Sequence, residues 1–155
     1  MGLPIQTYFS PLGGLQAAIV NLIQAANVSL DLGAYAFNSN PIANAVIAAQ
    51  ARGVTCRVLL DGHLSGSQNV QVLRMFDAGV PVRCAFQFTT YHNKTIVTDA
   101  LNTLTGSANF TYQAENCNAE NISIIEDGPT AAAYTANFTS DWSGALPYVP
   151  PRPHA

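Results

Sequence analysis

A histidine and a lysine lie two residues apart in the segment HNKTIVTD, which spans positions 92–99. The segment is rich in β-branched residues and is predicted to be a strand, in which alternate side chains share one face. His92 and Lys94 are therefore expected to lie side by side. An imidazole can attack a phosphoryl group or transfer a proton, and an ammonium group can neutralise its oxygens. The pair predicts phosphoryl-transfer chemistry.

Three further polar side chains follow this pair in two short turns. Ser107 and Asn109 lie in the segment GSANFT, and Glu120 lies in NAEN before the apolar run ISII. A hydroxyl and an amide can donate to phosphoryl oxygens beside Lys94, although both residue types are also common in ordinary turns. Glu120 is either a surface acid or the acceptor that orients the His92 imidazole, as an aspartate does in a hydrolase triad.

Asp99 ends the same segment but is predicted to have a different role. Seven residues separate it from His92, and in a regular strand an odd spacing places it on the opposite face. Asp99 and Ala100 also form a tight turn between two predicted strands, where an aspartate side chain bonds to the backbone. We therefore expect Asp99 to stabilise the hairpin without contacting the substrate.

Three other side chains are candidates for contact with a substrate. His63 follows a predicted strand end and is either a cleft residue or an exposed loop histidine. Phe88 and Tyr91 precede His92, and they either stack on nucleic-acid bases or pack in the core or at its rim. No Cys, His, Asp or Glu spacing is typical of a metal site, so no metal or other cofactor is expected.

The cysteines offer no disulfide or metal pattern. Cys56 and Cys84 are expected to be small buried strand residues, and Cys117 lies in a polar loop close to Glu120. The set contains no CxxC pair. An incidental loop cysteine is favoured over a reactive thiol at position 117.

The first half of the chain alternates predicted strands and helices. Strands are expected over residues 5–9, 28–37, 54–60 and 80–88, and helices over 10–26, 38–52 and 66–77. Residues 92–98 and 101–105 predict a hairpin, residues 121–125 a strand, and residues 129–142 a final helix. In the last two helices the expected inward residues are Val72, Leu73, Phe76, Ala132, Ala136 and Phe138.

This order predicts an α/β fold with a mixed, mostly parallel β-sheet and helices on both faces. In such sheets, functional sites gather at the carboxyl ends of the parallel strands. We expect one domain over residues 1–145 and a proline-rich tail over residues 146–155.

The composition is apolar and weakly charged, with 48% hydrophobic residues, 10% charged residues and a net charge of −3. So few charges on a free surface indicate an apolar area buried in an oligomer. A polyanion would have to bind at a local positive site, because the chain as a whole is not basic.

The chain start, MGLPIQTYF, lacks the pattern of a signal peptide, and no apolar run reaches membrane-spanning length. No stable membrane association is expected. A mature secreted chain would look the same, so a cytoplasmic and a periplasmic or secreted location both stay open.

The pattern HxKxxxxD, followed by GSxN and by the acid in NxEN, resembles the phospholipase D superfamily. The segments YFSP at 8–11, AYAF at 34–37 and the RGV…LLD run at 52–61 fit the same family, so the resemblance covers residues 8 to about 142. A short chain with one motif copy is similar to the small bacterial endonucleases of this superfamily. The resemblance implies an α/β/α sandwich and a phosphodiesterase that requires no metal.

The resemblance also implies a mechanism in which His92 attacks phosphorus and forms a phosphohistidine. A second histidine protonates the leaving oxygen, and water then releases the product. Lys94 and Asn109, with Ser107, would stabilise the equatorial oxygens, and Glu120 would orient His92. The chain has three histidines, and the other two lack a neighbouring lysine motif. Two copies are therefore expected to share one site in a C2 homodimer.

Three functions stay open on the sequence. The first, which we predict, is a nonspecific endonuclease that cleaves DNA, or DNA and RNA. The second is a phospholipase D-type lipid phosphodiesterase, which would need an exposed apolar rim. The third is a catalytically idle binding dimer, and the complete motif set argues against it.

Overall fold

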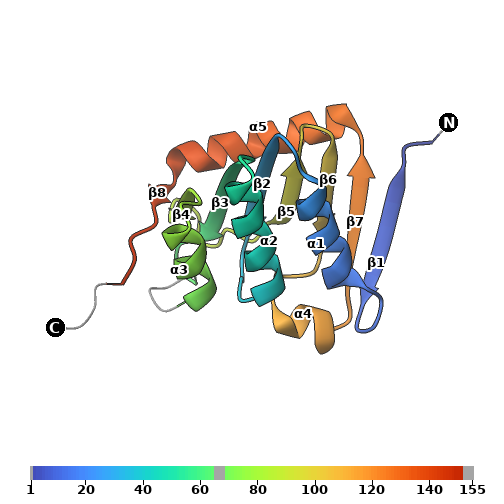
Figure 1. Cartoon of the computed structure of the whole chain (residues 1–155), viewed down its shortest axis with the longest axis horizontal. Coiled ribbons are helices and arrows are strands. Elements are labelled where there is room, and N and C mark those ends of the chain that lie inside the picture. Colours follow the sequence, from blue (N-terminus) through green and yellow to red (C-terminus); the bar gives the residue numbers. More distant parts are fainter. Residues whose placement is uncertain (1, 65–68, 152–155) are drawn as a thin grey trace.

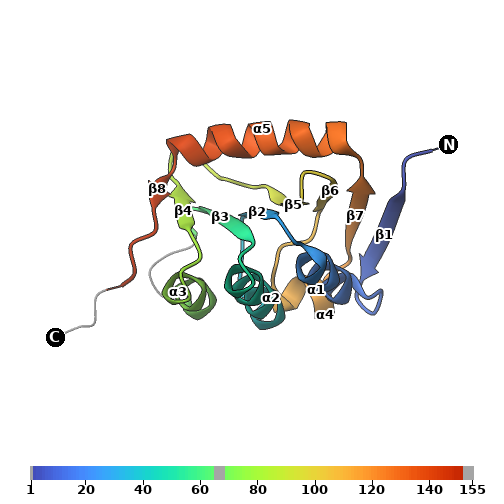
Figure 2. The ribbon, with the colours of Figure 1, turned by 45° about the horizontal axis from the view of Figure 1, so that its top comes forward.

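The computed structural model describes residues 2–64 and 69–151. One β-sheet lies between two layers of helices (Figures 1 and 2). The described strands are β1 (Ile5–Ser10), β2 (Ser29–Ala34), β3 (Thr55–Asp61), β4 (Val82–Ala85), β5 (Lys94–Thr98), β6 (Asn102–Gly106), β7 (Glu120–Glu126) and β8 (Leu146–Pro147). The described helices are α1 (Leu15–Ala25), α2 (Asn40–Ala51), α3 (Val70–Asp77), α4 (Tyr112–Asn116) and α5 (Gly128–Gly144).

The described strands form one eight-stranded sheet in the order β1-β7-β6-β5-β2-β3-β4-β8. Strands β2, β3 and β4 are parallel, because a crossover helix connects each to the next. The other neighbours are antiparallel, because the connections between β5, β6 and β7 reverse the chain direction. The expected α/β fold with a mixed sheet is confirmed, but its parallel part is smaller than expected.

Helices cover both faces of the sheet, as expected. Figure 2 shows α1, α2 and α3 on one face and α5 on the other, where α5 packs on β6, β5, β2 and β4. The larger core lies beneath α1–α3, and Ile19, Leu30, Leu32, Ile96 and Leu104 are fully buried there. The central strands are apolar on both sides because both sides are covered.

Helix α1 begins later than the expected helix start at Ser10. Ser10 is the last residue of β1, and its hydroxyl donates to the carbonyl of Asn118. The Ser10–Pro11 peptide is cis, and α1 starts at Leu15 after Gly14, whose φ of 74° lies in the left-handed region. Ser10 does not cap the helix because its side chain holds the loop before β7 instead.

Two helices turn different residues inward than expected. In α3, Met75 is buried, whereas Phe76 is 37% exposed. In α5, Ala131 is buried, whereas Ala132 and Ala136 are exposed. In α5 the difference corresponds to a small rotation of the helix, because a stripe of alanines defines the apolar face weakly. In α3, Phe76 instead packs edge-on against Tyr148. The expected start of α3 at residue 66 lies outside the described residues.

The first residues of the predicted tail belong to the packed domain. Strand β8 pairs antiparallel with β4, with Leu146 opposite Cys84. Tyr148 is only 6% exposed and packs in the core. The expected boundary at residue 145 therefore falls inside the domain, because a proline-rich segment can still pair at a sheet edge.

The cysteines lie as expected. Cys56 and Cys84 are buried, Cys117 is exposed, and all three are free thiols. Burial raises the pKa of Cys56 to about 11, so this thiol stays protonated near neutral pH. Within the described ranges, no helix has both the length and the apolar character needed to cross a bilayer.

Candidate active site

One edge of the sheet collects the ends of five strands. Strands β2 and β3 end there, and β5 begins there, because β5 runs antiparallel to β2 with Lys94 opposite Ala34. For the same reason β6 ends beside the start of β7, with Gly106 opposite Ile122. The predicted site residues therefore come together at the carboxyl ends of the parallel strands.

An open cleft of about 400 Å³ lies at this edge, and its lining includes His92, Lys94, Ser107, Asn109 and Tyr134. Four of the five predicted catalytic residues thus share one cleft. The fifth, Glu120, lies directly behind the lining, where its carboxylate contacts Ser107. Residues from β5, from the turn after β6 and from α5 together form the site.

His92 and Lys94 are in contact, although His92 is not part of the strand. The ladder between β5 and β2 ends at Lys94, so His92 lies two residues before β5 and not inside it as expected. The Nζ atom of Lys94 is 3.1 Å from Nδ1 of His92 and donates to the His92 carbonyl at 2.7 Å. His92 is exposed, and Lys94 is only 8% exposed. An accessible imidazole therefore lies beside a largely desolvated ammonium group.

Lys94 experiences two opposing influences on its charge. Burial lowers the pKa of Lys94, and the negative charge of Glu120 partly opposes this decrease. The ring of Tyr35 lies 5.4 Å from Nζ of Lys94 and 4.7 Å from the His92 ring. Tyr35 directly follows β2, in the segment AYAF, and was not predicted as a site residue from the sequence. Its position at a strand end was the signal that could have identified it.

Glu120 contacts different partners than expected. Its Oε2 atom is hydrogen-bonded to the hydroxyl of Ser107, and its Oε1 atom accepts from the side-chain amide of Asn118 at 3.2 Å. Among the described contacts, no hydrogen bond joins Glu120 to His92, so the expected contact is not formed in this chain. Ser107 and Asn118 thus engage both carboxylate oxygens of Glu120.

Asn109 is anchored by its carbonyl oxygen. Its Oδ1 atom accepts from the backbone N–H of Ala36 at 3.4 Å. The next residue, Phe110, is buried and forms a bridge to Phe37, which fixes the turn against the end of β2. The Nδ2 group of Asn109 is therefore the end that can donate into the cleft.

Asp99 lies at the far end of β5 from Lys94. Its carboxylate accepts from the backbone N–H groups of Val28 at 2.7 Å, Ser29 at 3.0 Å and Asn27 at 3.0 Å. Burial would raise the pKa of Asp99, but these hydrogen bonds outweigh it and lower the pKa below its ordinary value. These contacts tie the turn after β5 to the segment that leads into β2, so they support a structural role for Asp99.

The three additional substrate-contact candidates lie outside the cleft lining. The ring of Tyr91 packs in the smaller core, and the residue is 2% exposed. Phe88 is half-exposed, with its ring centroid 6.1 Å from that of Tyr91, and His63 is an exposed loop residue that packs edge-on against Phe86. Asp61 is buried and was not predicted as a site residue, but it accepts from the backbone N–H of Tyr91 and so fixes the segment before the cleft.

Comparison with known proteins identifies a family. A family model described as "Cardiolipin synthase, PLD-like domain" matches residues 19–142. The chain is 35% identical to a phospholipase D of Rickettsia prowazekii over 88% of its own length and 66% of that protein. It is 31% identical to the mitochondrial cardiolipin hydrolase of Homo sapiens over 86% of its own length and 55% of that protein. The chain thus spans about two thirds or less of these relatives.

Solved structures agree with this family. Nuc from Salmonella typhimurium, a phospholipase D family member, has a TM-score of 0.90 and 27% identity, over 95% of this chain and 99% of Nuc. NucT from Helicobacter pylori has a TM-score of 0.79 and 18% identity, over 94% of this chain and 100% of NucT, and supports the fold alone. The chain therefore belongs to the phospholipase D superfamily and carries its phosphodiesterase domain.

Proposed function

We propose that this chain is a nonspecific endonuclease that hydrolyses nucleic-acid phosphodiesters without a metal ion. The observation that carries the proposal is the contact between an exposed His92 and a buried Lys94 in an open cleft. Neutral imidazole is a competent nucleophile near neutral pH, and a desolvated ammonium group beside it stabilises charge that develops on phosphoryl oxygens.

The reaction proceeds in two displacements at phosphorus. In the first, a ring nitrogen of His92 forms a bond to phosphorus, and the bond to the leaving oxygen breaks. A second imidazole gives its proton to that oxygen. In the second, the same imidazole takes a proton from water, whose oxygen bonds to phosphorus and releases His92. Lys94 and the amide of Asn109 bind the phosphoryl oxygens in both steps.

Glu120 and Ser107 support this chemistry indirectly in the single chain. The carboxylate of Glu120 holds the hydroxyl of Ser107 at the cleft wall. The same negative charge counters the effect of burial on Lys94 and so favours the ammonium form that the reaction needs. We assign Glu120 the role of a positioning residue.

The second imidazole is proposed to come from a second copy of the chain. In the described part of the cleft lining, His92 is the one histidine, whereas the two displacements use two imidazoles. Near the end of β1, Phe9 is 61% exposed, and Leu12 in the loop that follows is 99% exposed. Phe9 pairs with Asn121, whose backbone N–H donates to Ser107. This apolar surface would be covered in a C2 homodimer that brings two copies of His92 together.

A lipid phosphodiesterase is the second candidate. The exposed Phe9 and Leu12 near the end of β1 would also suit contact with a lipid surface. The relatives named phospholipase D and cardiolipin hydrolase point in the same direction. We favour nucleic acid because the cleft itself is open and lined by polar side chains and one tyrosine, with no apolar channel for an acyl chain among its lining residues.

Two incubations in EDTA separate the candidates. Supercoiled plasmid is mixed with the purified chain, and vesicles of phosphatidylcholine or cardiolipin are treated in parallel. Nicking of the plasmid supports the proposal. Lipid hydrolysis without nicking favours the lipid phosphodiesterase, and no turnover of either substrate or of bis(p-nitrophenyl) phosphate favours the idle dimer. His92→Ala, checked for folding by circular dichroism, is the control for a contaminating nuclease.

A further inference from the structure

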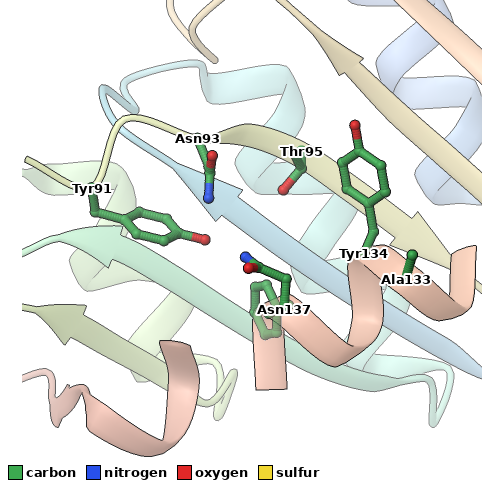
Figure 3. A pocket seen from close by; sticks show the side chains of 7 residues that line it. Tyr91, Asn93, Thr95, Ala133, Tyr134 and Asn137 are labelled. Atoms are coloured by element: carbon green, nitrogen blue, oxygen red, sulfur yellow. The ribbon is translucent and has the colours of Figure 1, made fainter. Parts of the chain in front are cut away.

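A second pocket of about 230 Å³ adjoins the active-site cleft on the side of the sheet that α5 covers. Asn93, Thr95 and Tyr134 line both the pocket and the cleft, so the two are continuous. Figure 3 shows that the polar ends of Tyr91, Asn93 and Asn137 point toward one another in this pocket. The reaction described above uses none of these groups.

The floor of the pocket is the hydroxyl of Tyr91, which is 2% exposed. A Cβ atom at Gly33 would lie 2.5 Å from this hydroxyl and 3.1 Å from Oγ1 of Thr95, so a glycine is needed beneath it. The side chain of Asn93 is hydrogen-bonded to Tyr91. Burial raises the pKa of Tyr91 to about 12, so the hydroxyl remains a donor.

The wall on α5 supplies an aromatic face and a second amide. The Nδ2 group of Asn137 donates to Asp141 at 3.0 Å, which leaves its Oδ1 atom as an acceptor for a ligand. Tyr134 lies between the pocket and the cleft, since it lines both. The pocket thus combines one stacking surface with hydrogen-bond donors and acceptors from three side chains.

We propose that this pocket holds one unpaired base of the substrate next to the phosphodiester that His92 attacks. The proposal rests on the nuclease function proposed above. An unstacked base is recognised by stacking on an aromatic ring and by hydrogen bonds along its edge, and Tyr134 and the two amides supply these contacts. The volume is below the roughly 300–1,000 Å³ of pockets for drug-sized ligands, so the pocket suits a fragment such as one base.

A lipid head group fits these contacts less well. The pocket lining contains no charged side chain that could pair with a serine or ethanolamine group. A quaternary ammonium group could contact the rings of Tyr134 and Phe138, but it has no N–H or O–H groups and no acceptors. It could not bond to either amide, both on exposed residues, or to the buried Tyr91 hydroxyl, so these polar groups would contribute nothing to its binding. A base satisfies them.

The proposal is tested with single-stranded oligonucleotides that carry one abasic residue at each position around the cleaved bond. For the unmodified chain, we expect cleavage to fall when the abasic residue occupies the one position whose base enters the pocket. Asn137→Ala should lower kcat/KM on the intact oligonucleotide roughly 3- to 12-fold, the effect of one neutral hydrogen bond. On the abasic oligonucleotide the same variant should have no effect.

Tyr134 provides a second comparison. Tyr134→Ala should lower kcat/KM roughly 5- to 150-fold, the range for loss of one aromatic stacking partner. Tyr134→Phe should retain the rate. The matched control is Ser143→Ala, which also removes one side-chain hydrogen bond from an exposed residue of α5 but lies outside the pocket lining.

Equal losses for Asn137→Ala on intact and abasic oligonucleotides would overturn the base pocket while leaving the nuclease function standing. The absence of any position-specific effect of the abasic residue would do the same. If the unmodified chain hydrolyses phosphatidylcholine vesicles and no oligonucleotide, the nuclease function and the base pocket both fail. A decrease in that lipid activity in Asn137→Ala would then assign the pocket to a head group.

Discussion

Replacing Asp99 is expected to destabilise the fold without damaging the active site. The carboxylate accepts from three backbone N–H groups at the start of β2, at the opposite end of β5 from Lys94. A side-chain cap of this kind is worth typically about 1 kcal/mol for each hydrogen bond in a partly exposed position. Asp99→Ala should therefore lower the free energy of unfolding by about 3 kcal/mol.

Asp99→Asn should have a smaller effect. An asparagine keeps the oxygen that accepts from Val28 and Ser29, but it loses the charge and the second acceptor, so we expect about 1 kcal/mol. Asparagine also tolerates the positive φ of 54° at this position better than alanine does. At this chain length, 1 kcal/mol corresponds to roughly 2–4 °C in Tm. Asp99→Asn should therefore lower the Tm by about 2–4 °C, and Asp99→Ala by about 6–12 °C.

The assay combines thermal unfolding, followed by circular dichroism, with kcat/KM measured well below both Tm values. Glu126→Gln, a change at an exposed acid of β7, is the matched control and should alter neither quantity. Since hydrogen bonds hold the pKa of Asp99 below its ordinary value, its contribution should be present above about pH 4 and lost as the pH falls through the lowered pKa. An Asp99→Asn variant with unchanged Tm and a large loss of kcat/KM would refute the structural role.

Three further predictions concern the site and its support. Wild-type and His92→Ala chains can be unfolded and refolded together in equal amounts. The activity per wild-type chain should then fall to about half, because a shared site needs two intact copies. Unchanged activity per wild-type chain would show that the sites are independent. Lys94→Gln should abolish turnover. In the wild type, kcat should fall at high pH with a midpoint below the ordinary lysine pKa of 10.5, because burial lowers the pKa of Lys94. A midpoint at or above this pKa would contradict the prediction. Gly33→Ala should lower the free energy of unfolding by about 1–3 kcal/mol, because the new methyl group overpacks against the Tyr91 hydroxyl. Adding Tyr91→Phe in the same chain should restore part of this free energy, measured by chemical unfolding. No recovery would show that the strain does not come from the Tyr91 hydroxyl.

Several side chains of the candidate site could be selected from the sequence. Alternation of strands and helices predicted where the parallel strands end, and HNKTIVTD followed by GSAN supplied side chains that meet at that edge. The even spacing correctly predicted contact between His92 and Lys94, even though the strand begins at Lys94. Asp99 lies away from them because it is at the other end of β5, so the strand-face argument was not needed.

The partners of individual polar groups could not be predicted from the sequence. Glu120 is bonded to Ser107 and Asn118 because the turn after β6 lies beside the start of β7. The contribution of Tyr35 likewise depends on how β5 enters the sheet next to β2. Such contacts depend on tertiary geometry at strand ends, where periodicity no longer constrains the direction of a side chain.

The packing of the helices and of the chain end could not be predicted from the hydrophobic pattern either. The apolar stripe of α5 contains small alanines, so a rotation that buries Ala131 in place of Ala132 hardly changes its periodicity. Tyr148 lies in the proline-rich segment PYVPPRPHA, whose composition did not indicate burial. The short pairing of β8 with β4 nevertheless brings Tyr148 into the core.

The central claim is that the His92 imidazole forms a covalent bond to phosphorus. Its most direct test is intact-protein mass spectrometry of a reaction stopped with alkali within milliseconds, followed by peptide mapping at high pH. We expect a phosphoryl adduct, stable in base and labile in acid, on the peptide that contains His92, and no adduct in His92→Ala. Rapid turnover without any adduct on His92, or an adduct that persists in the alanine variant, would contradict the account.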